Sequence, residues 1–257
     1  MPRFLATGIA AFAVLGAVLL LASASPAQAS DGKIHVTWLG HAAFQVTSPG
    51  GTTLLIDPFI TDNPKTPEAF KDLSQYTPDV ILLTHSHGDH VGDTVAIATA
   101  GNVKVIGVFD HVKSLDLPEG LAMGGNPGGK FTIGDVTVHF VPAMHSSSPG
   151  GRPLGYVIEF ADGRTLYDTG DTWIFGDMAL IQEIFSPNII LLQAGGGPYN
   201  QDPKIAALAI KKYFQPDVVI PMHYGTWPIL SSEAEVRDAL GGSAGIKFMA
   251  PGDSADF

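Results

Sequence analysis

The sequence predicts a layered α/β domain made of two β-rich units that pack face to face. Short β-branched runs alternate with turn clusters and helical patterns, which is typical of sheets covered by helices. The two halves of the chain also resemble each other, because the segment PDVILLTH at 78–85 is echoed by PDVVIPMH at 216–223. A duplicated unit packed against its twin would bring the ends of these strands to one common edge.

Strands are expected where short runs of β-branched and aromatic residues lie between turn residues. These runs cover 34–39, 43–47, 53–56, 80–84, 103–108, 136–141, 156–160, 165–167, 189–193 and 218–221. Helical patterns cover 93–100, 176–185, 203–214 and 233–240. The third helix is expected to begin with Asp202 as its N-cap and Pro203 at its first position. The fourth carries Glu233 and Glu235 in its first turn, where they suit the helix dipole.

Residues 1–29 are predicted to be a signal peptide. Arg3 supplies a positive start, residues 4–22 are apolar and uncharged, and Ala27-Gln28-Ala29 matches a signal-peptidase site. The alternative is an uncleaved signal anchor, because the apolar stretch is just long enough to span a bilayer. In either case the folded domain, residues 30–257, is expected to be exported to the periplasm or secreted.

The composition limits the classes of partner. The chain has 257 residues, no cysteine and a net charge of −11. An exported domain without cysteine must rely on packing and bound metal instead of disulfides, and it offers no thiolate ligand or nucleophile. The negative charge argues against a nucleic acid partner. A small-molecule or lipid-like substrate is expected, and no stable membrane anchor once a signal peptide is removed.

The most informative motif is the run His85-Ser86-His87-Gly88-Asp89-His90, directly after an apolar strand. Imidazole nitrogens and a carboxylate are ligands that suit zinc, iron or manganese. Because these four side chains cannot share one face of a helix, we expect a loop wrapped around metal ions. The alternative is a solvated histidine-rich loop without a ligand.

Three further candidate ligands also follow strands: His145, Asp171 and His223. Taken alone, each is typical of a turn or capping residue. Together with the histidine run they become candidate ligands, because two metal ions need more ligands than four side chains supply.

The histidine run resembles the HxHxDH signature of the metallo-β-lactamase superfamily. Other segments resemble its UlaG-like metal-dependent hydrolases, a branch that includes L-ascorbate-6-phosphate lactonase: WLGHAAF at 38–44, LIDPF at 55–59, GDT at 170–172 and MHY at 222–224. The resemblance covers residues 33–249. It implies an αββα four-layer sandwich of two facing mixed β-sheets with outer helices, and it implies a metal-dependent hydrolase.

The resemblance also implies seven ligands for two divalent transition metal ions, with zinc as the first choice and manganese or iron as alternatives. Three hold the first ion, three hold the second and one bridges the two: His85, His87 and His145; Asp89, His90 and His223; and Asp171. Asp168 is the alternative for the bridging position, but the GDT segment favours Asp171.

Two more residues receive supporting roles from the resemblance. Asp57 matches an acidic residue that orients a ligand histidine, and the alternative is a turn residue before Pro58. His41 resembles an active-site histidine that contacts substrate or transfers a proton, and the alternative is a packed structural residue. The predicted catalytic residues are therefore Asp89, His41 and Asp171. The other histidines match no motif and receive no role: His35, His111 and His139.

One segment departs from the branch. Relatives usually carry a Gly-Asp-x-Phe-Thr-Met-like stretch after the strand that ends near Gln193, whereas this chain reads AGGGPYNQ at 194–201. We expect this loop to lie close to the site and to alter the substrate pocket.

The implied reaction is hydrolysis, in which a hydroxide that bridges two cations attacks a carbonyl carbon or a phosphorus atom. The expected substrate is a small ester, lactone or phosphodiester. One alternative is a lipid phosphodiesterase, because five aromatic residues are available to line an apolar pocket: Trp173, Phe175, Tyr199, Tyr224 and Trp227. Another alternative is an exported metal-binding protein without catalytic activity.

Overall fold

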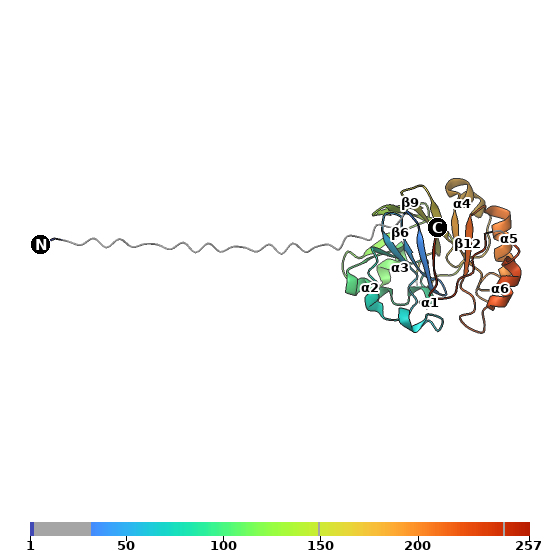
Figure 1. Ribbon diagram of the computed structural model, residues 1–257, viewed down its shortest axis with the longest axis horizontal. Coiled ribbons are helices and arrows are strands. Elements are labelled where there is room, and N and C mark those ends of the chain that lie inside the picture. The colour runs from blue at the N-terminus through green and yellow to red at the C-terminus, as the bar shows by residue number, and fades with distance from the viewer. Residues whose placement is uncertain (3–31, 149, 244) are drawn as a thin grey trace.

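The computed structural model describes residues 1–2, 32–148, 150–243 and 245–257. Two β-sheets lie between two groups of helices, which is the four-layer arrangement that the family resemblance implies (Figure 1). Apart from its first two residues, the expected signal peptide lies outside the described residues. Within the described ranges, no helix has the length and apolar character needed to cross a membrane.

The first sheet has seven strands. Its pairs are antiparallel from β13 to β3 and parallel from β3 to β6. In spatial order the strands are β13 (Ser254–Asp256), β1 (His35–Gly40), β2 (Ala43–Thr47), β3 (Thr53–Ile56), β4 (Val80–Leu82), β5 (Lys104–Val108) and β6 (Ala122–Gly125).

The second sheet has six strands. Its pairs are parallel from β12 to β10 and antiparallel from β10 to β7. In spatial order the strands are β12 (Val218–Met222), β11 (Ile189–Gln193), β10 (Thr165–Asp168), β9 (Leu154–Phe160), β8 (Val136–Pro142) and β7 (Lys130–Ile133).

The main hydrophobic core lies between the sheets. Phe44 and Leu82 from the first sheet belong to one buried cluster with Phe140, Tyr156 and Ile158 from the second. Because a sheet alternates its side chains between two faces, each strand gives one apolar set to this core. Burial of that surface, worth about 25 cal/mol per Å², fixes the two sheets against each other.

The outer faces are covered by helices. On the first sheet, α2 (Thr94–Gly101) and α3 (Phe109–Ser114) pack Ile97 and Val112 into a second cluster with Ile81 and Val105.

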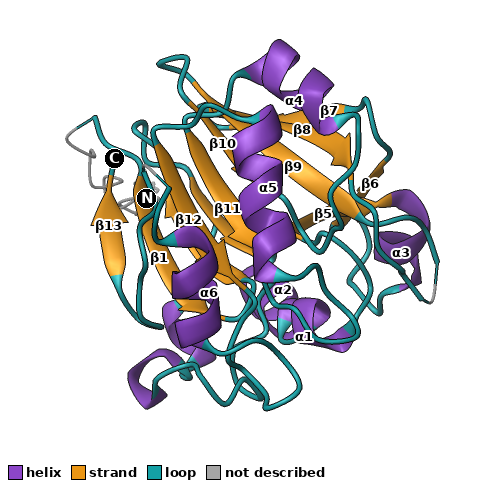
Figure 2. Cartoon of the chain, turned by 90° about the vertical axis from the view of Figure 1, so that its right-hand side faces the viewer, coloured by secondary structure: helices purple, strands orange, loops and turns teal. Residues whose placement is uncertain are grey.

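On the second sheet, α5 and α6 lie across β11 and β12, and α4 lies beside them (Figure 2). These three helices are α4 (Met178–Phe185), α5 (Pro203–Tyr213) and α6 (Glu233–Leu240). Two short 3-10 helices, η1 (Glu68–Phe70) and η2 (Leu73–Gln75), precede β4.

The predicted strands and helices are all present, with ends shifted by at most about two residues. The Asp202 side chain accepts the backbone N–H of Lys204 as the N-cap of α5, and Ser232 and Glu235 form a capping box at α6. Three strands, β6, β7 and β13, and helix α3 were not predicted. The Gly-rich β6 and the Ser-Ala-Asp strand β13 have little β propensity of their own. They form strands because their backbones pair with those of β5 and β1, respectively.

The expectation that the histidine run is a loop throughout was wrong. After His87, Gly88–Val91 forms one helical turn, α1, in which the backbone N–H groups of Val91 and Gly92 bond to the carbonyls of His87 and Gly88. The turn ends at Gly92 (φ 38°), where a Cβ would lie 2.5 Å from Phe59 Cα. A short extended stretch followed by one helical turn is therefore the local structure that carries these four side chains.

Candidate metal centre

The candidate ligands lie where strands of both sheets end. His85 follows β4 in the first sheet, whereas His145, Asp171 and His223 follow β8, β10 and β12 in the second. A backbone hydrogen bond joins the two sheets at this edge, because the N–H of His223 donates to the carbonyl oxygen of His41 at 3.0 Å. The similarity between the two halves of the sequence predicts that their strand ends meet at one edge. In the structure, strands of both sheets end at this edge.

The backbone is strained at three positions of this edge. His41, Asp57 and His223 have φ angles of 56°, 42° and 68°, in the left-handed region that favours glycine. The two other non-glycine residues with positive φ in the described chain, Asn102 and Ser186, are ordinary helix C-caps. Strained residues persist where the surroundings hold them, and such positions cluster at functional sites.

The seven predicted ligands fall into three overlapping groups whose ligand atoms lie within 4.8 Å of one another. His85, His87 and His145 form the first group, with His85 Nε2 2.8 Å from His87 Nδ1. The other two groups share His90 and contain the remaining residues: His41, Asp89, His90 and His223; and His85, His90 and Asp171. The structure thus brings all seven together and adds His41 to them.

Asp171 lies between the groups. Its Oδ2 is 3.5 Å from His145 Nε2 and 3.2 Å from His223 Nε2, and its Oδ1 is 3.5 Å from His90 Nε2. The carboxylate therefore reaches residues of both predicted ions. Asp168, the alternative, accepts the N–H of Gly170 in the turn that precedes Asp171 and belongs to none of the groups. The geometry favours Asp171 as the bridging residue.

The donor atoms of this edge fit bound cations. His85 Nε2 and His87 Nδ1 face each other, and His90 Nε2 lies 3.3 Å from His223 Nε2. At most one nitrogen of such a pair can serve as a hydrogen-bond donor while the other accepts. The buried Oδ1 of Asp171 has no hydrogen-bond partner among the described residues. Converging imidazole nitrogens with an unsatisfied carboxylate oxygen form the type of ligand set that divalent transition metals take.

Burial and mutual charge shape the titration of these groups. Burial by itself would lower the pKa of His90, but Asp171 and Asp57 outweigh it and hold that pKa well above its ordinary value. Burial would raise the pKa of Asp171, but His223 and His90 hold it well below its ordinary value. Asp168 behaves differently, since burial and the charge of Asp57 raise its pKa to about 8.

Asp57 supports His90, as the resemblance implies. Its Oδ2 lies 2.6 Å from His90 Nδ1, and its two oxygens accept the backbone N–H and the hydroxyl of Thr84. The same Thr84 hydroxyl lies 3.1 Å from His85 Nδ1. Thr84 was not singled out from the sequence, although it stands immediately before the histidine run. A carboxylate on the far nitrogen of a ligand histidine fixes the ring orientation and tautomer.

His41 is buried and holds Asp89. Its Nε2 lies 3.1 Å from Asp89 Oδ2, its Nδ1 lies 2.7 Å from Thr226 Oγ1, and its ring centroid lies 3.6 Å from that of His223. Burial and the neighbouring His223 lower the pKa of His41 to about 3, so the ring is neutral. A neutral ring that accepts the Thr226 hydroxyl at Nδ1 donates from Nε2 to Asp89.

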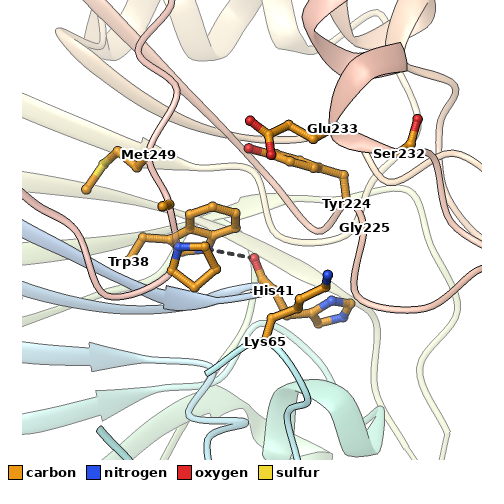
Figure 3. A pocket seen from close by; sticks show the side chains of 10 residues that line it. Trp38, His41, Lys65, Tyr224, Gly225, Ser232, Glu233 and Met249 are labelled. Atoms are coloured by element: carbon orange, nitrogen blue, oxygen red, sulfur yellow. Dashed lines mark hydrogen bonds between the residues drawn. The ribbon is translucent and has the colours of Figure 1, made fainter. Parts of the chain in front are cut away.

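A cavity of about 260 Å³ lies beside His41. Figure 3 shows the side chains that line it. Trp38 lines it and donates its indole N–H to the carbonyl oxygen of His41 at 3.0 Å. The ring of Tyr224 packs against that of Trp38, with 5.6 Å between the ring centroids. Lys65 and Glu233 also line the cavity (Figure 3). His41 lines this cavity and is absent from the lining of the cavity over the predicted ligands.

The loop that departs from the branch lies against His223, as predicted. A Cβ at Gly195 would lie 2.6 Å from the carbonyl oxygen of His223 and 2.9 Å from its Nδ1, so only glycine permits this approach. The Asn200 side-chain amide lies 3.3 Å from His223 Nδ1. Asn200 and Thr226 are site residues that the sequence did not single out, and the unusual loop was the only signal for Asn200.

A cavity of about 400 Å³ opens over the predicted ligands. It is lined by five of the predicted ligands, His87, Asp89, His145, Asp171 and His223. Three further segments complete the lining: Ser146 after β8, Tyr199 and Asn200 after β11, and Trp227, Ile229 and Leu230 after β12. Of the five aromatics considered for an apolar pocket, Tyr199 and Trp227 line it. Tyr224 lines the cavity beside His41, Phe175 packs on the core, and Trp173 is 58% exposed.

The histidines without a motif belong to none of the groups. His35 pairs with Asp256 at 2.6 Å and His139 pairs with Glu159 at 2.9 Å, both on sheet strands. His111 is buried in α3, and its Nδ1 has no hydrogen-bond partner among the described residues.

Comparisons with known proteins agree with this geometry. The profile of the beta-lactamase superfamily domain matches residues 35–223, which include every predicted ligand. The chain belongs to this superfamily. A UPF0173 metal-dependent hydrolase from Anaeromyxobacter sp. strain K is 44% identical over 91% of this chain and 90% of its own length. One from Myxococcus xanthus is 44% identical over 86% of this chain and 80% of its length.

Two solved structures share the fold. Igni18, a metallo hydrolase from the archaeon Ignicoccus hospitalis, superposes with a TM-score of 0.77 at 33% identity, covering 88% of this chain and 98% of its own. The isothiocyanate hydrolase from Delia radicum gut bacteria superposes with a TM-score of 0.68 at 19% identity, covering 87% of this chain and 98% of its own. At that identity the second comparison shows the fold alone. The chain is therefore a metal-dependent hydrolase with the metallo-β-lactamase fold.

Proposed function

We propose that this enzyme is a dinuclear hydrolase of the UlaG-like branch that cleaves a small ester, lactone or phosphodiester. The observation that carries the proposal is the convergence of the seven predicted ligands, with Asp171 between His145 of one group and His90 and His223 of the other. His85, His87 and His145 would hold one ion, Asp89, His90 and His223 the second, and Asp171 both.

Two bound cations would lower the pKa of a water molecule and stabilise the negative charge that develops on the substrate oxygen. The protein's own residues supply orientation. Asp57 holds His90, and His41 holds Asp89 through a neutral ring fixed by Thr226. Neither the hydroxyl of Ser146 nor that of Ser147 lies near a free base that would make it a nucleophile. Ser146 Oγ lies 3.4 Å from His87 Nε2, a predicted ligand, and Ser147 Oγ lies 3.0 Å from that of Ser86.

His41 acts in this scheme as a positioning residue for Asp89. Its ring is buried, its two nitrogens are engaged by Thr226 and Asp89, and it does not line the cavity over the ligands. This arrangement supports the structural alternative for His41 over direct contact with substrate.

The nature of the ions follows from the donor set, which contains five imidazoles and two carboxylates and no thiolate. We propose zinc, because it takes nitrogen and carboxylate ligands in open catalytic sites. Manganese and iron accept the same ligands. Elemental analysis of protein purified from its native compartment would identify the metal, and about two ions per chain are expected. A single ion per fully active chain would contradict the dinuclear proposal.

The substrate test uses the metal-loaded enzyme against bis-p-nitrophenyl phosphate, a set of lactones, a set of carboxylic esters and a set of β-lactams. Turnover of an ester, lactone or phosphodiester is expected, together with its loss in Asp171→Ala. Metal-loaded protein that hydrolyses none of these compounds would overturn the proposed reaction.

A lipid phosphodiesterase is the second candidate. The observation that favours it is the aromatic surface at the cavity, where Tyr199 is 67% exposed and Trp227 lines the same cavity. Hydrolysis of phosphatidylethanolamine vesicles at a rate above that of short-chain esters would support this candidate over the first.

We also propose that the enzyme is exported. The support is the positive start, the apolar stretch 4–22 and the Ala27-Gln28-Ala29 sequence. Mass spectrometry of the protein from the cell envelope fraction is expected to find Ser30 at the N-terminus. Retention of Met1 in an envelope-bound protein would instead support the signal anchor, and retention in the cytosol would contradict export.

A further inference from the structure

The cavity over the ligands has one wall made of large apolar side chains. Tyr199 comes from the segment after β11, and Trp227, Ile229 and Leu230 come from the segment after β12. These side chains face the same cavity as His87, His145, Asp171 and His223. A molecule bound over the ligands can therefore contact these side chains.

The two loops that form the wall are held together. Between the loops, the N–H of Ser231 donates to the carbonyl oxygen of Gly195 at 2.7 Å. Within the second loop, the N–H of Leu230 donates to the carbonyl oxygen of Trp227 at 3.0 Å. Gly197 (φ 68°) leaves room for the backbone of Ile229, which a Cβ at that position would meet. These contacts place the two loops side by side along the cavity.

Much of this apolar surface faces solvent. Tyr199 is 67% exposed and Ile229 is 52% exposed, although both are large hydrophobic residues. Exposed apolar surface next to a cavity marks a site where a ligand covers it. Each methylene group that a ligand buries there is worth about a fourfold gain in binding.

The lining offers no charged partner for an anionic substrate beyond the metal ligands. Among the described residues that line this cavity there is no lysine or arginine, and its charged groups are the carboxylates Asp89 and Asp171. Phosphate groups are usually bound by arginine, lysine or a helix N-terminus. A second phosphate or carboxylate on the substrate would find no side-chain cation along this wall.

Building on the proposed hydrolase function, we propose that the substrate is an uncharged carboxylic ester or lactone with an alkyl or aryl group. The reacting carbonyl lies over the ligand groups, and the apolar group lies along Tyr199, Trp227 and Ile229. Hydrolysis adds water across the acyl C–O bond. The acyl carbon gains the water oxygen, the ester oxygen gains a proton, and the products are a carboxylic acid and an alcohol.

The test measures kcat/KM of the metal-loaded enzyme for p-nitrophenyl acetate, butyrate and octanoate and for bis-p-nitrophenyl phosphate. We expect kcat/KM to rise at least about tenfold from acetate to octanoate and to be lower for the phosphodiester than for any ester. Faster turnover of the phosphodiester, or equal kcat/KM along the ester series, would overturn the proposal.

Variants of the wall residues test whether the preference for the octanoate ester depends on this surface. Ile229→Ser and Tyr199→Ser are each expected to reduce the octanoate-to-acetate ratio of kcat/KM by about threefold to tenfold. Leu208→Ser is the matched control, because Leu208 is 47% exposed on α5 and lines none of the cavities described above. An equal reduction of the ratio in Leu208→Ser would overturn the assignment of the wall.

A binding measurement separates this proposal from the proposed reaction. Titration calorimetry of the metal-loaded protein with octanamide, acetamide and hexyl phosphate needs no turnover. The apolar site is supported if octanamide binds more tightly than the other two compounds and if Ile229→Ser weakens that binding. If such a protein hydrolyses no ester, only the proposed hydrolysis is wrong. Equal binding of all three would overturn the apolar site even if hydrolysis is observed.

Discussion

The carboxylate of Asp57 lies 2.6 Å from Nδ1 of His90, while Nε2 of the same ring lies 3.5 Å from the carboxylate of Asp171. One imidazole is therefore held between two buried aspartates. Asp57 follows β3, His90 belongs to α1 and Asp171 follows β10, so this relationship joins both sheets. The two carboxylates together define the orientation of the His90 ring.

Asp57→Asn should weaken metal binding by about 10- to 100-fold. The reason is that asparagine has one NH2 group in place of a carboxylate oxygen, and this group donates hydrogen bonds. The side chain can then no longer accept from both His90 Nδ1 and Thr84. Competition with a chelator of known affinity measures the effect. The control is Asp62→Asn, at an exposed position, which should retain the wild-type affinity. Unchanged affinity in Asp57→Asn would show that the carboxylate does not orient His90 in the bound state.

Removal of a ligand should have a larger effect than removal of a supporting residue. His87→Ala and Asp171→Ala are each expected to lose metal and to lower kcat/KM by more than about 100-fold, while the far-ultraviolet circular dichroism stays close to that of the wild type. His35→Ala serves as the control, because His35 pairs with Asp256 away from the groups. Full metal content with unchanged hydrolysis in either ligand variant would refute the assignment of the centre.

Asn200 is expected to fix the orientation of His223. If Nε2 of His223 binds the metal, Nδ1 of the same ring carries the proton and needs a hydrogen-bond acceptor. The side-chain amide nitrogen of Asn200 lies 3.3 Å from this Nδ1. When the amide group is flipped, its carbonyl oxygen takes this place and accepts the hydrogen bond. Asn200→Ala should weaken metal binding by about 10-fold or more and remove the downfield Nδ1–H proton signal of His223. Asn200→Asp keeps an acceptor and should retain the signal.

The control for this pair is Asn126→Ala, an exposed asparagine in the loop before β7. It should leave both the metal affinity and the proton signal unchanged. If Asn200→Ala also leaves them unchanged, the loop merely covers His223 and does not orient it.

Asp168 should make stability depend on pH. Burial and Asp57 raise its pKa to about 8, so the folded protein keeps a proton that the unfolded chain releases near its ordinary pKa of 3.8. This contribution to stability is fully present below about pH 4 and is lost as the pH rises towards 8, by at most about 1.4 kcal/mol per pH unit. Asp168→Asn still accepts from Gly170 and should remove this slope.

Chemical denaturation of the metal-free proteins between pH 5 and pH 9 measures the difference between Asp168→Asn and the wild type. The variant should gain relative stability as the pH rises across this window. Asp168→Ala, which loses the hydrogen bond to Gly170, should be less stable than Asp168→Asn by about 1 kcal/mol or more at every pH. A parallel pH dependence in Asp168→Asn and wild type would mean that Asp168 is ionised in the folded protein.

Local patterns were sufficient for most of the framework. Val218–Met222 is a strand because β-branched residues fit a pleated sheet, and Pro203 begins a helix because its missing N–H is not needed there. Local patterns did not predict the strand Ser254–Asp256, because its residues form a strand only by pairing with β1.

The sequence by itself determined the chemistry of this protein: imidazole and carboxylate donors with no thiolate, placed where strands end. Only the tertiary structure decided which donors meet. His145 and His223 approach Asp171 because packing of the two sheets brings distant strand ends to one edge. The positions of Asn200 and Thr226 also depend on that packing, because contacts between residues far apart in the chain leave no periodic trace in the sequence.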